Sequence, residues 1–227
     1  MSNSGYDLAA LDVEPAPLTP AQPRRPENAA RSLFHVTSAA VALVLLRLCP
    51  SREWLVAVSG SLALICWSLE AARRLHPPVN GYLMRFFSRI AHEEETHRVN
   101  SSTWYLTALV GLALFAPLRS AELGVVVLGL ADPAAGFIGR RIGRTKIRKN
   151  RSLEGTLGFF AVGMAAAMTL LVAFHPLPLP TMLAIAAVSS AAGALIEVAT
   201  VRLDDNFTIP VTVAIAAATF ERVYPMA

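Results

Sequence analysis

Seven apolar segments, separated by short polar stretches, make up most of the chain after residue 30. A transmembrane helix needs about 20 mostly apolar residues, with a range of about 17–25, and several of these segments are at the short end of that range. The pattern therefore predicts an all-α, polytopic integral membrane protein with about seven transmembrane helices. The predicted spans lie near 33–49, 54–71, 103–117, 121–138, 154–174, 180–201 and 207–222.

Residues 1–30 have a different pattern, rich in proline, alanine and polar residues and without apolar periodicity. Because proline disfavours the interior of a helix, we predict a disordered cytoplasmic tail over 1–30, followed by a single transmembrane domain over 31–227. Residues 79–92 place Arg85 and Arg89 four positions apart, with apolar residues grouped around them. This stretch fits either an amphipathic helix on the inner membrane surface or a short connecting helix.

The composition agrees with a membrane protein, since 54% of the residues are hydrophobic and 16% are charged. Soluble domains carry about 25% charged residues. A chain this apolar is not disordered over most of its length. The two cysteines, Cys49 and Cys66, lie inside apolar segments, which excludes a disulfide-built secreted domain.

The basic residues indicate the orientation in the membrane. They gather before the first predicted span and between the second and third, the fourth and fifth, and the sixth and seventh, whereas the other loops are nearly neutral. Cytoplasmic loops carry an excess of Lys and Arg, so we predict that the N-terminus is inside and the C-terminus outside. Topology and lipid headgroups explain the formal net charge of +4, and a nucleic-acid partner is not expected.

An ionisable residue within a membrane span is costly and is therefore a functional candidate. Asp132 stands in such a position, directly after a long apolar run. The pair Asp132-Pro133 is also typical of a helix start, with Asp as the N-cap and Pro at the first helical position. We therefore expect the fourth span to break near Ala131 and to restart.

The glycines Gly136, Gly139 and Gly143 follow at a spacing that suits either close helix packing or backbone approach to a phosphate. A stretch with seven cations and no acid then covers 140–151. Topology charge explains the sign of this stretch. It does not explain why the stretch lies between that aspartate and the sequence SLEGT at 152–156.

A second acidic group precedes the seventh span and consists of Asp204, Asp205 and Asn206, with Glu197 about two turns earlier. One acid suffices for a helix N-cap, so the second is available for another role. Glu154 either interacts with the dipole of its helix or holds a divalent cation. The predicted topology places all these carboxylates, and also Asp132 of the fourth span, near the cytoplasmic side. Carboxylates beside a cationic loop suit Mg²⁺ and a nucleoside triphosphate.

These motifs together resemble the signature of the family that contains the dolichol kinases, the phytol kinases and the CTP-dependent diacylglycerol kinases (the polyprenol kinase family). The resemblance covers residues 31–215. Ser32 and Arg151 stand where that family usually has Lys. The matching elements are Arg31-Ser32-Leu33-Phe34-His35; Asp132-Pro133-Ala134-Ala135-Gly136, Gly139-Arg140, Gly143-Arg144 and Lys146; Ser152-Leu153-Glu154-Gly155-Thr156; and Glu197 with Asp204-Asp205-Asn206-Phe207-Thr208-Ile209-Pro210.

The resemblance implies an enzyme that transfers the γ-phosphoryl group of CTP, or of another nucleoside triphosphate, to a lipid alcohol. The substrate would be an isoprenoid alcohol (dolichol, polyprenol or phytol) or diacylglycerol, at the cytoplasmic face of the cell inner membrane or an equivalent organelle membrane. The expected catalytic residues are Asp132, Glu154 and Asp205. The expected Mg²⁺ ligands are Asp132, Asp204, Asp205 and Glu197. The expected nucleotide-binding residues are Gly136, Gly139, Arg140, Gly143, Arg144, Lys146, Arg151, Ser152, Gly155 and Thr156.

Two other functions fit the same residues. A cytidylyltransferase similar to the CDP-diacylglycerol synthases would also use CTP and a metal, but attack would fall on the α-phosphorus. A small membrane transporter or scaffold would use the acids as helix caps and the cations as topology charge. The reaction product separates the two enzymes, because a kinase releases CDP and a cytidylyltransferase releases pyrophosphate.

Overall fold

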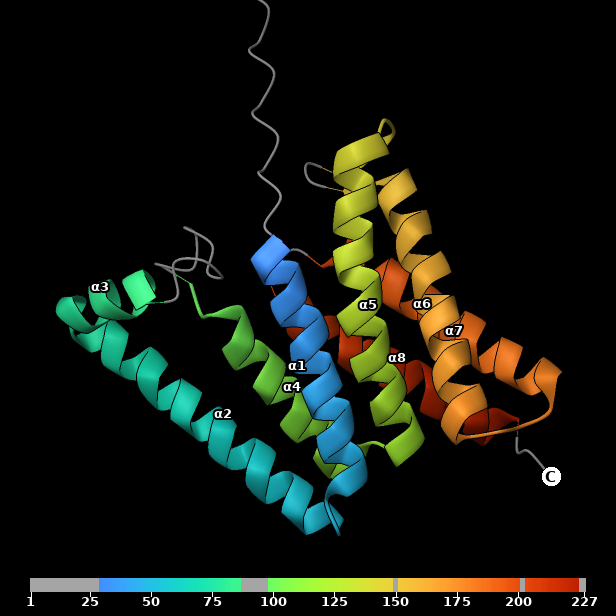
Figure 1. Ribbon diagram of the computed structural model, residues 1–227, viewed down its shortest axis with the longest axis horizontal. Helices are drawn as coiled ribbons and strands as arrows, with labels where there is room; N and C mark the ends of the chain where they lie inside the picture. The colour runs from blue at the N-terminus through green and yellow to red at the C-terminus, as the bar shows by residue number, and fades with distance from the viewer. Residues whose placement is uncertain (1–28, 87–97, 149–150, 201–202, 225–227) are drawn as a thin grey trace, which may run out of the picture.

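A computed structural model of the chain describes residues 29–86, 98–148, 151–200 and 203–224. Within these ranges the protein is all-α, as predicted, apart from one short β-hairpin (Figure 1). The helices are α1 (Ala29–Leu48), α2 (Arg52–Leu75), α3 (Pro77–Phe86), α4 (Ser101–Phe115), α5 (Leu118–Ile142), α6 (Leu153–Phe174), α7 (Leu179–Ala199) and α8 (Asp205–Val223). The strands β1 (Lys146–Arg148) and β2 (Arg151–Ser152) pair antiparallel between α5 and α6.

Four of the described helices, α2, α5, α6 and α7, are long and apolar enough to cross a membrane. The apolar part of α1 (Ser32–Leu48) and α4 are shorter. Large apolar side chains such as Leu64, Leu195 and Ile215 lie exposed on the outside of the bundle. Lipid chains solvate such an apolar surface, whereas its exposure to water is unfavourable. The chain is therefore an integral membrane protein. The count of seven spans and the orientation stay predictions.

Helix α5 is the central element and packs against α1, α6, α7 and α8. Small residues let the neighbouring backbones approach it closely. A Cβ atom added to Gly124 would lie 2.5 Å from the backbone oxygen of Pro210 on α8, and one added to Gly129 would lie 2.2 Å from the Cβ of Ala39 on α1. The hydrophobic core lies around α5, where Leu123, Leu128 and many other apolar side chains are buried.

The expectation that the fourth span breaks near Ala131 is wrong. Helix α5 continues from Leu118 to Ile142 with Pro133 inside it, so Asp132 is an interior helix residue and no N-cap. A proline in a helix interior costs about 3 kcal/mol in a water-exposed helix. Neighbouring helices make it tolerable within a membrane bundle, and α5 is enclosed by four of them.

Contacts between helix ends show that α2 and α4 run in opposite directions. At one end of the bundle the backbone N–H of Asn100, before α4, donates to Oε1 of Glu70 near the end of α2 (2.9 Å). At the opposite end Arg52, at the start of α2, donates to the carbonyls of Leu114 and Ala116 around the end of α4 (2.9 Å each). We call the first the hairpin end, because it also holds β1 and β2, and the second the far end.

Two predictions about irregular regions fall partly outside the described residues. The predicted tail over 1–30 lies outside them, except that Ala29 and Ala30 already belong to α1. Of the predicted helix at 79–92, the structure describes the part up to Phe86, which forms α3 together with Pro77 and Pro78. The part from 87 onward lies outside the described residues.

Candidate active site

The β-hairpin closes the gap between the end of α5 and the start of α6. Its base is held by the backbone, since Leu153 N–H donates to the carbonyl of Thr145 (2.9 Å). The carboxylate of Glu154 in turn accepts a hydrogen bond from the N–H of Thr145 (3.0 Å). Ser152 caps α6 by accepting from the N–H of Gly155 (3.2 Å). Glu154 therefore has a structural partner within the hairpin as well as its predicted catalytic role.

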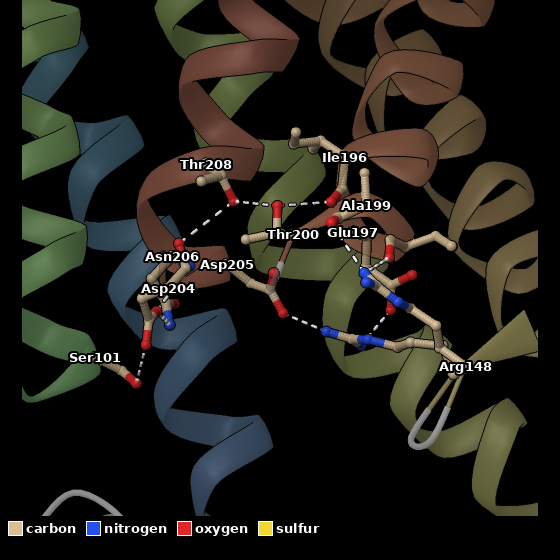
Figure 2. A network of polar contacts seen from close by, with 12 residues as sticks. Ser101, Arg148, Ile196, Glu197, Ala199, Thr200, Asp204, Asp205, Asn206 and Thr208 are labelled. Carbon is tan, nitrogen blue, oxygen red and sulfur yellow. Dashed lines mark hydrogen bonds and ion pairs between the residues drawn. The ribbon is translucent and has the colours of Figure 1, made fainter. Parts of the chain in front are cut away.

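The hairpin reaches over to the end of α7 through two arginines. Nη1 of Arg148 donates to the carbonyls of Val198 and Ala199 (2.9 Å each), which belong to the last turn of α7, where a helix leaves its carbonyls without intrahelical partners (Figure 2). Arg151 follows on β2. The cationic stretch thus docks onto the carboxyl end of α7, where the helix dipole favours positive charge.

Arg151 joins two carboxylates that are distant in the sequence. Its Nη1 donates to Oε1 of Glu197 on α7, and its Nη2 donates to Oδ2 of Asp205 at the start of α8. Glu197 is buried, with 2% of its side chain exposed, whereas about a quarter of Arg151 and Asp205 remains exposed. In Figure 2 a dashed line joins Asp205 to a guanidinium group, and Glu197 lies close by. The predicted convergence of acids from separate segments is present for this pair.

Asp132 influences the same group through its charge, although no hydrogen bond or ion pair joins it to another residue in the described ranges. Its charge acts on both Arg151 and Asp205. Burial raises the pKa of Asp205 to about 7, the charges of Asp132, Asp204 and Glu197 add to the rise, and Arg151 opposes it. Burial alone would lower the pKa of Arg151, but the negative charges of Asp205, Glu197 and Asp132 hold it above its ordinary value. We call Asp132, Arg151, Glu197 and Asp205 the charged cluster.

Asp204 has a different role from its neighbour in the chain. Its Oδ1 caps α8 by accepting from the backbone N–H of Asn206 (2.9 Å) and from the side chain of the same residue (2.6 Å). Its Oδ2 accepts from the hydroxyl of Ser101 at the start of α4 (3.0 Å). One acid of the pair is therefore the helix cap, and Asp205 is the one that faces the arginine (Figure 2).

The glycines of the motif lie where α5 and α6 pack closely. A Cβ atom on Gly143 would lie 2.5 Å from the hydroxyl oxygen of Ser152, and one on Gly155 would lie 3.0 Å from the carbonyl oxygen of Ala135. Gly139 faces Ser152 and Gly155. Packing explains these three positions, while their predicted contact with a nucleotide stays a prediction.

The other predicted nucleotide-binding residues surround this contact. The guanidinium of Arg140 folds over Gly136, and its Nε is buried without a hydrogen-bond partner among the described residues. Arg144, two residues before the hairpin, and Lys146, the first residue of β1, are both exposed, and no ion pair joins them to any residue in the described ranges. Thr156 donates its hydroxyl to the carbonyl of Ser152 (3.1 Å). Two cations are thus available to a polyanion at this face.

The donor atoms of the three carboxylates in the charged cluster fit Mg²⁺ in kind. All are carboxylate oxygens, which this hard cation prefers, and Oε2 of the buried Glu197 has no hydrogen-bond partner among the described residues. An orphaned buried carboxylate oxygen has a free position for a cation or a water. Within the same ranges no three His, Cys, Asp or Glu side chains form a ready-made metal site. The guanidinium of Arg151 provides the positive charge between Glu197 and Asp205 in this structure.

Sequence reasoning missed the polar contacts at the start of α4 and the end of α2. Ser101 was assigned no role, although it contacts Asp204. Glu70 and Arg73 are both buried, and Nε of the arginine donates to Oε2 of the glutamate (2.9 Å). The sequence feature that could have predicted this pair is an acidic residue, Glu70, inside the predicted second span and three positions before a basic residue, Arg73. The side chain of Arg31 lies outside the described part of the chain.

Comparison with known proteins finds several similar chains. The CTP-dependent diacylglycerol kinase 1 of Schizosaccharomyces pombe is 30% identical over 168 residues, which are 68% of this chain and 72% of that protein. The CTP-dependent diacylglycerol kinase 1 of Eremothecium gossypii is 29% identical over 164 residues, or 64% of this chain and 50% of that protein. The dolichol kinase of Saccharomyces cerevisiae is 26% identical over 150 residues, or 63% of this chain.

The chain spans about half the length of the Eremothecium gossypii protein and 28% of the dolichol kinase. No family model matches the chain. No solved structure matches it either.

Proposed function

The chain belongs to the family of the CTP-dependent diacylglycerol kinases and dolichol kinases, and we propose that it is a CTP-dependent lipid-alcohol kinase. It transfers the γ-phosphoryl group to the hydroxyl of diacylglycerol or of an isoprenoid alcohol such as dolichol, polyprenol or phytol. The reaction takes place at the cytoplasmic face of the membrane. The names of the relatives support CTP as the donor and a lipid as the acceptor.

The observation that carries this proposal is the charged cluster. Asp132 on α5, Arg151 on β2, Glu197 on α7 and Asp205 on α8 come from four elements and influence one another at the hairpin end. Bringing like charges together is unfavourable unless a cation compensates them, and Arg151 compensates only part of the negative charge that the three carboxylates carry when they are ionised. A site with surplus negative charge beside exposed cations suits a nucleotide with its metal ion.

Each group has a proposed role in phosphoryl transfer. Arg140, Arg144, Lys146 and Arg151 hold the triphosphate, with the backbone around Gly136, Gly139, Gly143, Ser152, Gly155 and Thr156 beside it. Asp132, Asp204, Asp205 and Glu197 hold Mg²⁺, which when bound neutralises charge on the transferring phosphoryl group. Asp132, Glu154 and Asp205 are the proposed catalytic carboxylates, and Glu154 also holds the hairpin through Thr145.

The chemical step is an in-line displacement. The lipid hydroxyl oxygen forms a bond to the γ-phosphorus while the bond from that phosphorus to the bridging oxygen of CDP breaks. The hydroxyl proton passes to one of the carboxylates, and CDP leaves with the electron pair of the broken bond. Such catalysis depends mostly on positioning and on charge stabilisation, which a site on helix ends and a short hairpin provides.

Incubation of the purified protein with γ-labelled CTP, Mg²⁺ and a panel of lipid alcohols tests the proposal. We expect a labelled lipid phosphate and CDP in equal amounts. The Asp132→Asn variant should lose about a hundredfold or more of this activity while keeping its melting temperature. The Glu53→Gln variant, exposed at the far end, is the matched control and should stay active. Release of pyrophosphate, or full activity of Asp132→Asn, would contradict the proposal.

A further inference from the structure

A cavity of about 530 Å³ lies between α1, α2 and α4, with α5 behind it. Its walls are mostly apolar and include Leu45, Leu62, Leu69, Leu106 and Leu109. Cavities of about 300–1,000 Å³ lined by apolar side chains with a few polar groups are typical of small-molecule sites. The charged cluster does not account for this space, since none of its four residues lines it.

Among the described residues, no close packing of α1 on α2 closes the side of the cavity that lies between these two helices. Helix α1 packs on α5 and α2 packs on α4, whereas α1 and α2 contact one another little; in Figure 1, α2 lies well to one side of α1. Four apolar side chains line the cavity and are also exposed, namely Phe34 and Val41 on α1 and Leu62 and Leu69 on α2. Exposed apolar residues of a membrane protein face lipid, so a bilayer lipid has direct access to this side of the cavity.

One end of the cavity is polar and adjoins the charged cluster. Ser101 and Asn206 line this end, and both are hydrogen-bonded to Asp204. Asp204 precedes Asp205 at the start of α8. An occupant that lies along the apolar walls therefore places its polar terminus beside the carboxylates of the proposed active site.

The same walls argue against the nucleotide as occupant. Arg73 is the only arginine or lysine among the lining residues that the structure describes, and it is engaged with Glu70 and Asn80. A triphosphate requires several cations, and those lie on the hairpin instead. A molecule with a long apolar part and one small polar end fits the cavity better.

We propose that this cavity binds the lipid alcohol, with its hydroxyl at Ser101 and Asn206 and its hydrocarbon entering from the bilayer between α1 and α2. The inference rests on the proposed lipid-alcohol kinase function and adds the place and route of the acceptor. Substrate and nucleotide then approach the charged cluster from opposite sides, the lipid from the cavity and CTP from the hairpin.

Cys66 lines the cavity and provides a binding test that needs no turnover. In phosphatidylcholine nanodiscs, the Cys49→Ala variant leaves Cys66 as the single thiol. Diacylglycerol or a polyprenol should slow its modification by a small membrane-permeant thiosulfonate about fivefold or more at saturation. The matched reporter combines Cys49→Ala and Cys66→Ala with Leu195→Cys on the outer face of α7, where the leucine is 70% exposed. Lipid alcohol should not protect that thiol.

Equal effects on the two reporters would overturn the proposed cavity, whatever the enzymatic activity. Protection of Cys66 in a protein that consumes no CTP would instead leave the binding site in place and reject the kinase function. The arms with diacylglycerol and with polyprenol also show which of the two lipid alcohols the cavity prefers.

A pair of tryptophan variants on α2 tests the entrance. Leu62→Trp narrows the opening, whereas Leu64→Trp places the same bulk on a side chain that is 69% exposed and does not line the cavity. We expect Leu62→Trp to raise KM for the long-chain lipid alcohol about tenfold, with kcat and KM for CTP nearly unchanged. Leu64→Trp should behave as the parent protein. The same KM in both variants would contradict an entrance between α1 and α2.

Discussion

Arg151 is the residue on which the proposed site most depends, because its positive charge interacts with two carboxylates at once. Its guanidinium bonds to Glu197 and Asp205, which lie on different helices. A planar group with several donors suits this double contact, whereas a lysine ammonium is a single point of charge. The family motif usually has Lys at this position, so this chain uses a wider group to connect α7 and α8.

Removal of the arginine should therefore destabilise the bundle. Arg151→Gln leaves the buried Glu197 without its cation, and breaking a buried ion pair in this way costs about 3–5 kcal/mol. Arg151→Lys should recover part of that loss. The comparison is the melting temperature in detergent, with Arg148→Gln as control because Arg148 bonds only to backbone carbonyls and is exposed. A larger loss in Arg148→Gln than in Arg151→Gln would reject this role.

The raised pKa of Asp205 predicts a pH effect on stability. The folded protein keeps this proton up to about pH 7, whereas the unfolded chain loses it near the ordinary value of 3.8. Proton uptake by the native state stabilises it at low pH, so this contribution decreases as the pH rises from about 4 to 7. Without metal ions, the melting temperature should fall over pH 5 to 7.5, and Asp205→Asn should reduce that slope. An unchanged slope in Asp205→Asn would show that another group is responsible.

At the level of elements, α5 combines packing and chemistry. Its first half carries the glycines that contact α8 and α1, its middle carries Asp132, and its last turns carry Gly139, which lies against Gly155 of α6. Because α5 is held on several sides, Asp132 has little freedom to move relative to the hairpin. Close packing of this helix is therefore a condition for the charged cluster to assemble.

Two glycines allow a direct test of this packing. A Cβ on Gly124 would overlap the backbone of Pro210, whereas one on Gly111 of α4 meets nothing within 4 Å. Gly124→Ala should destabilise the protein by about 1–3 kcal/mol. Gly111→Ala should be neutral or stabilise by about 0.5–1 kcal/mol, because alanine favours a helix. Thermal unfolding of both variants checks the pair, and similar melting temperatures would contradict the close contact of α5 and α8.

At the level of the whole molecule, the two ends of the bundle carry different charge arrangements. The hairpin end holds the charged cluster and exposed cations. The far end holds a buried carboxylate, Glu122, which bonds to Arg47 (2.8 Å) and to Nε2 of His175 (2.5 Å). These contacts connect α1, α5 and α6 and neutralise the far end internally. The orientation predicted from the basic loops places the hairpin end on the cytoplasmic side.

Reporter cysteines test that orientation. In a background of Cys49→Ala and Cys66→Ala, Ile147→Cys lies exposed on β1 and Leu118→Cys lies exposed at the far end. An impermeant maleimide should label Leu118→Cys in intact cells and Ile147→Cys only in inside-out vesicles. Labelling of both positions from one side would contradict an odd number of spans between them. Labelling of Ile147→Cys in intact cells and of Leu118→Cys only in inside-out vesicles would show that the orientation is the opposite of the predicted one.

The membrane class, the helical architecture and the set of candidate residues can all be predicted from the amino-acid pattern alone. Apolar length is a local property, so helices appear where the pattern predicts them. An N-cap for α8 within the group Asp204, Asp205 and Asn206 was also readable, since capping needs only residues a few positions apart. The same local reasoning failed at Pro133, because a helix enclosed by four others tolerates a residue that would break it alone.

Which charged side chains come into contact, and where a cavity for a lipid lies, depend on the packing of the helices and cannot be predicted from the pattern. Arg151 is 46 residues from Glu197 and 54 from Asp205, and their contact depends on how the hairpin, α7 and α8 pack. The close contact of Gly143 and Gly155 with their neighbours, and the cavity between α1, α2 and α4, likewise arise from helix placement. Side-chain pattern determines which surface of each helix is apolar, but the pairing of those surfaces is a property of the assembled bundle.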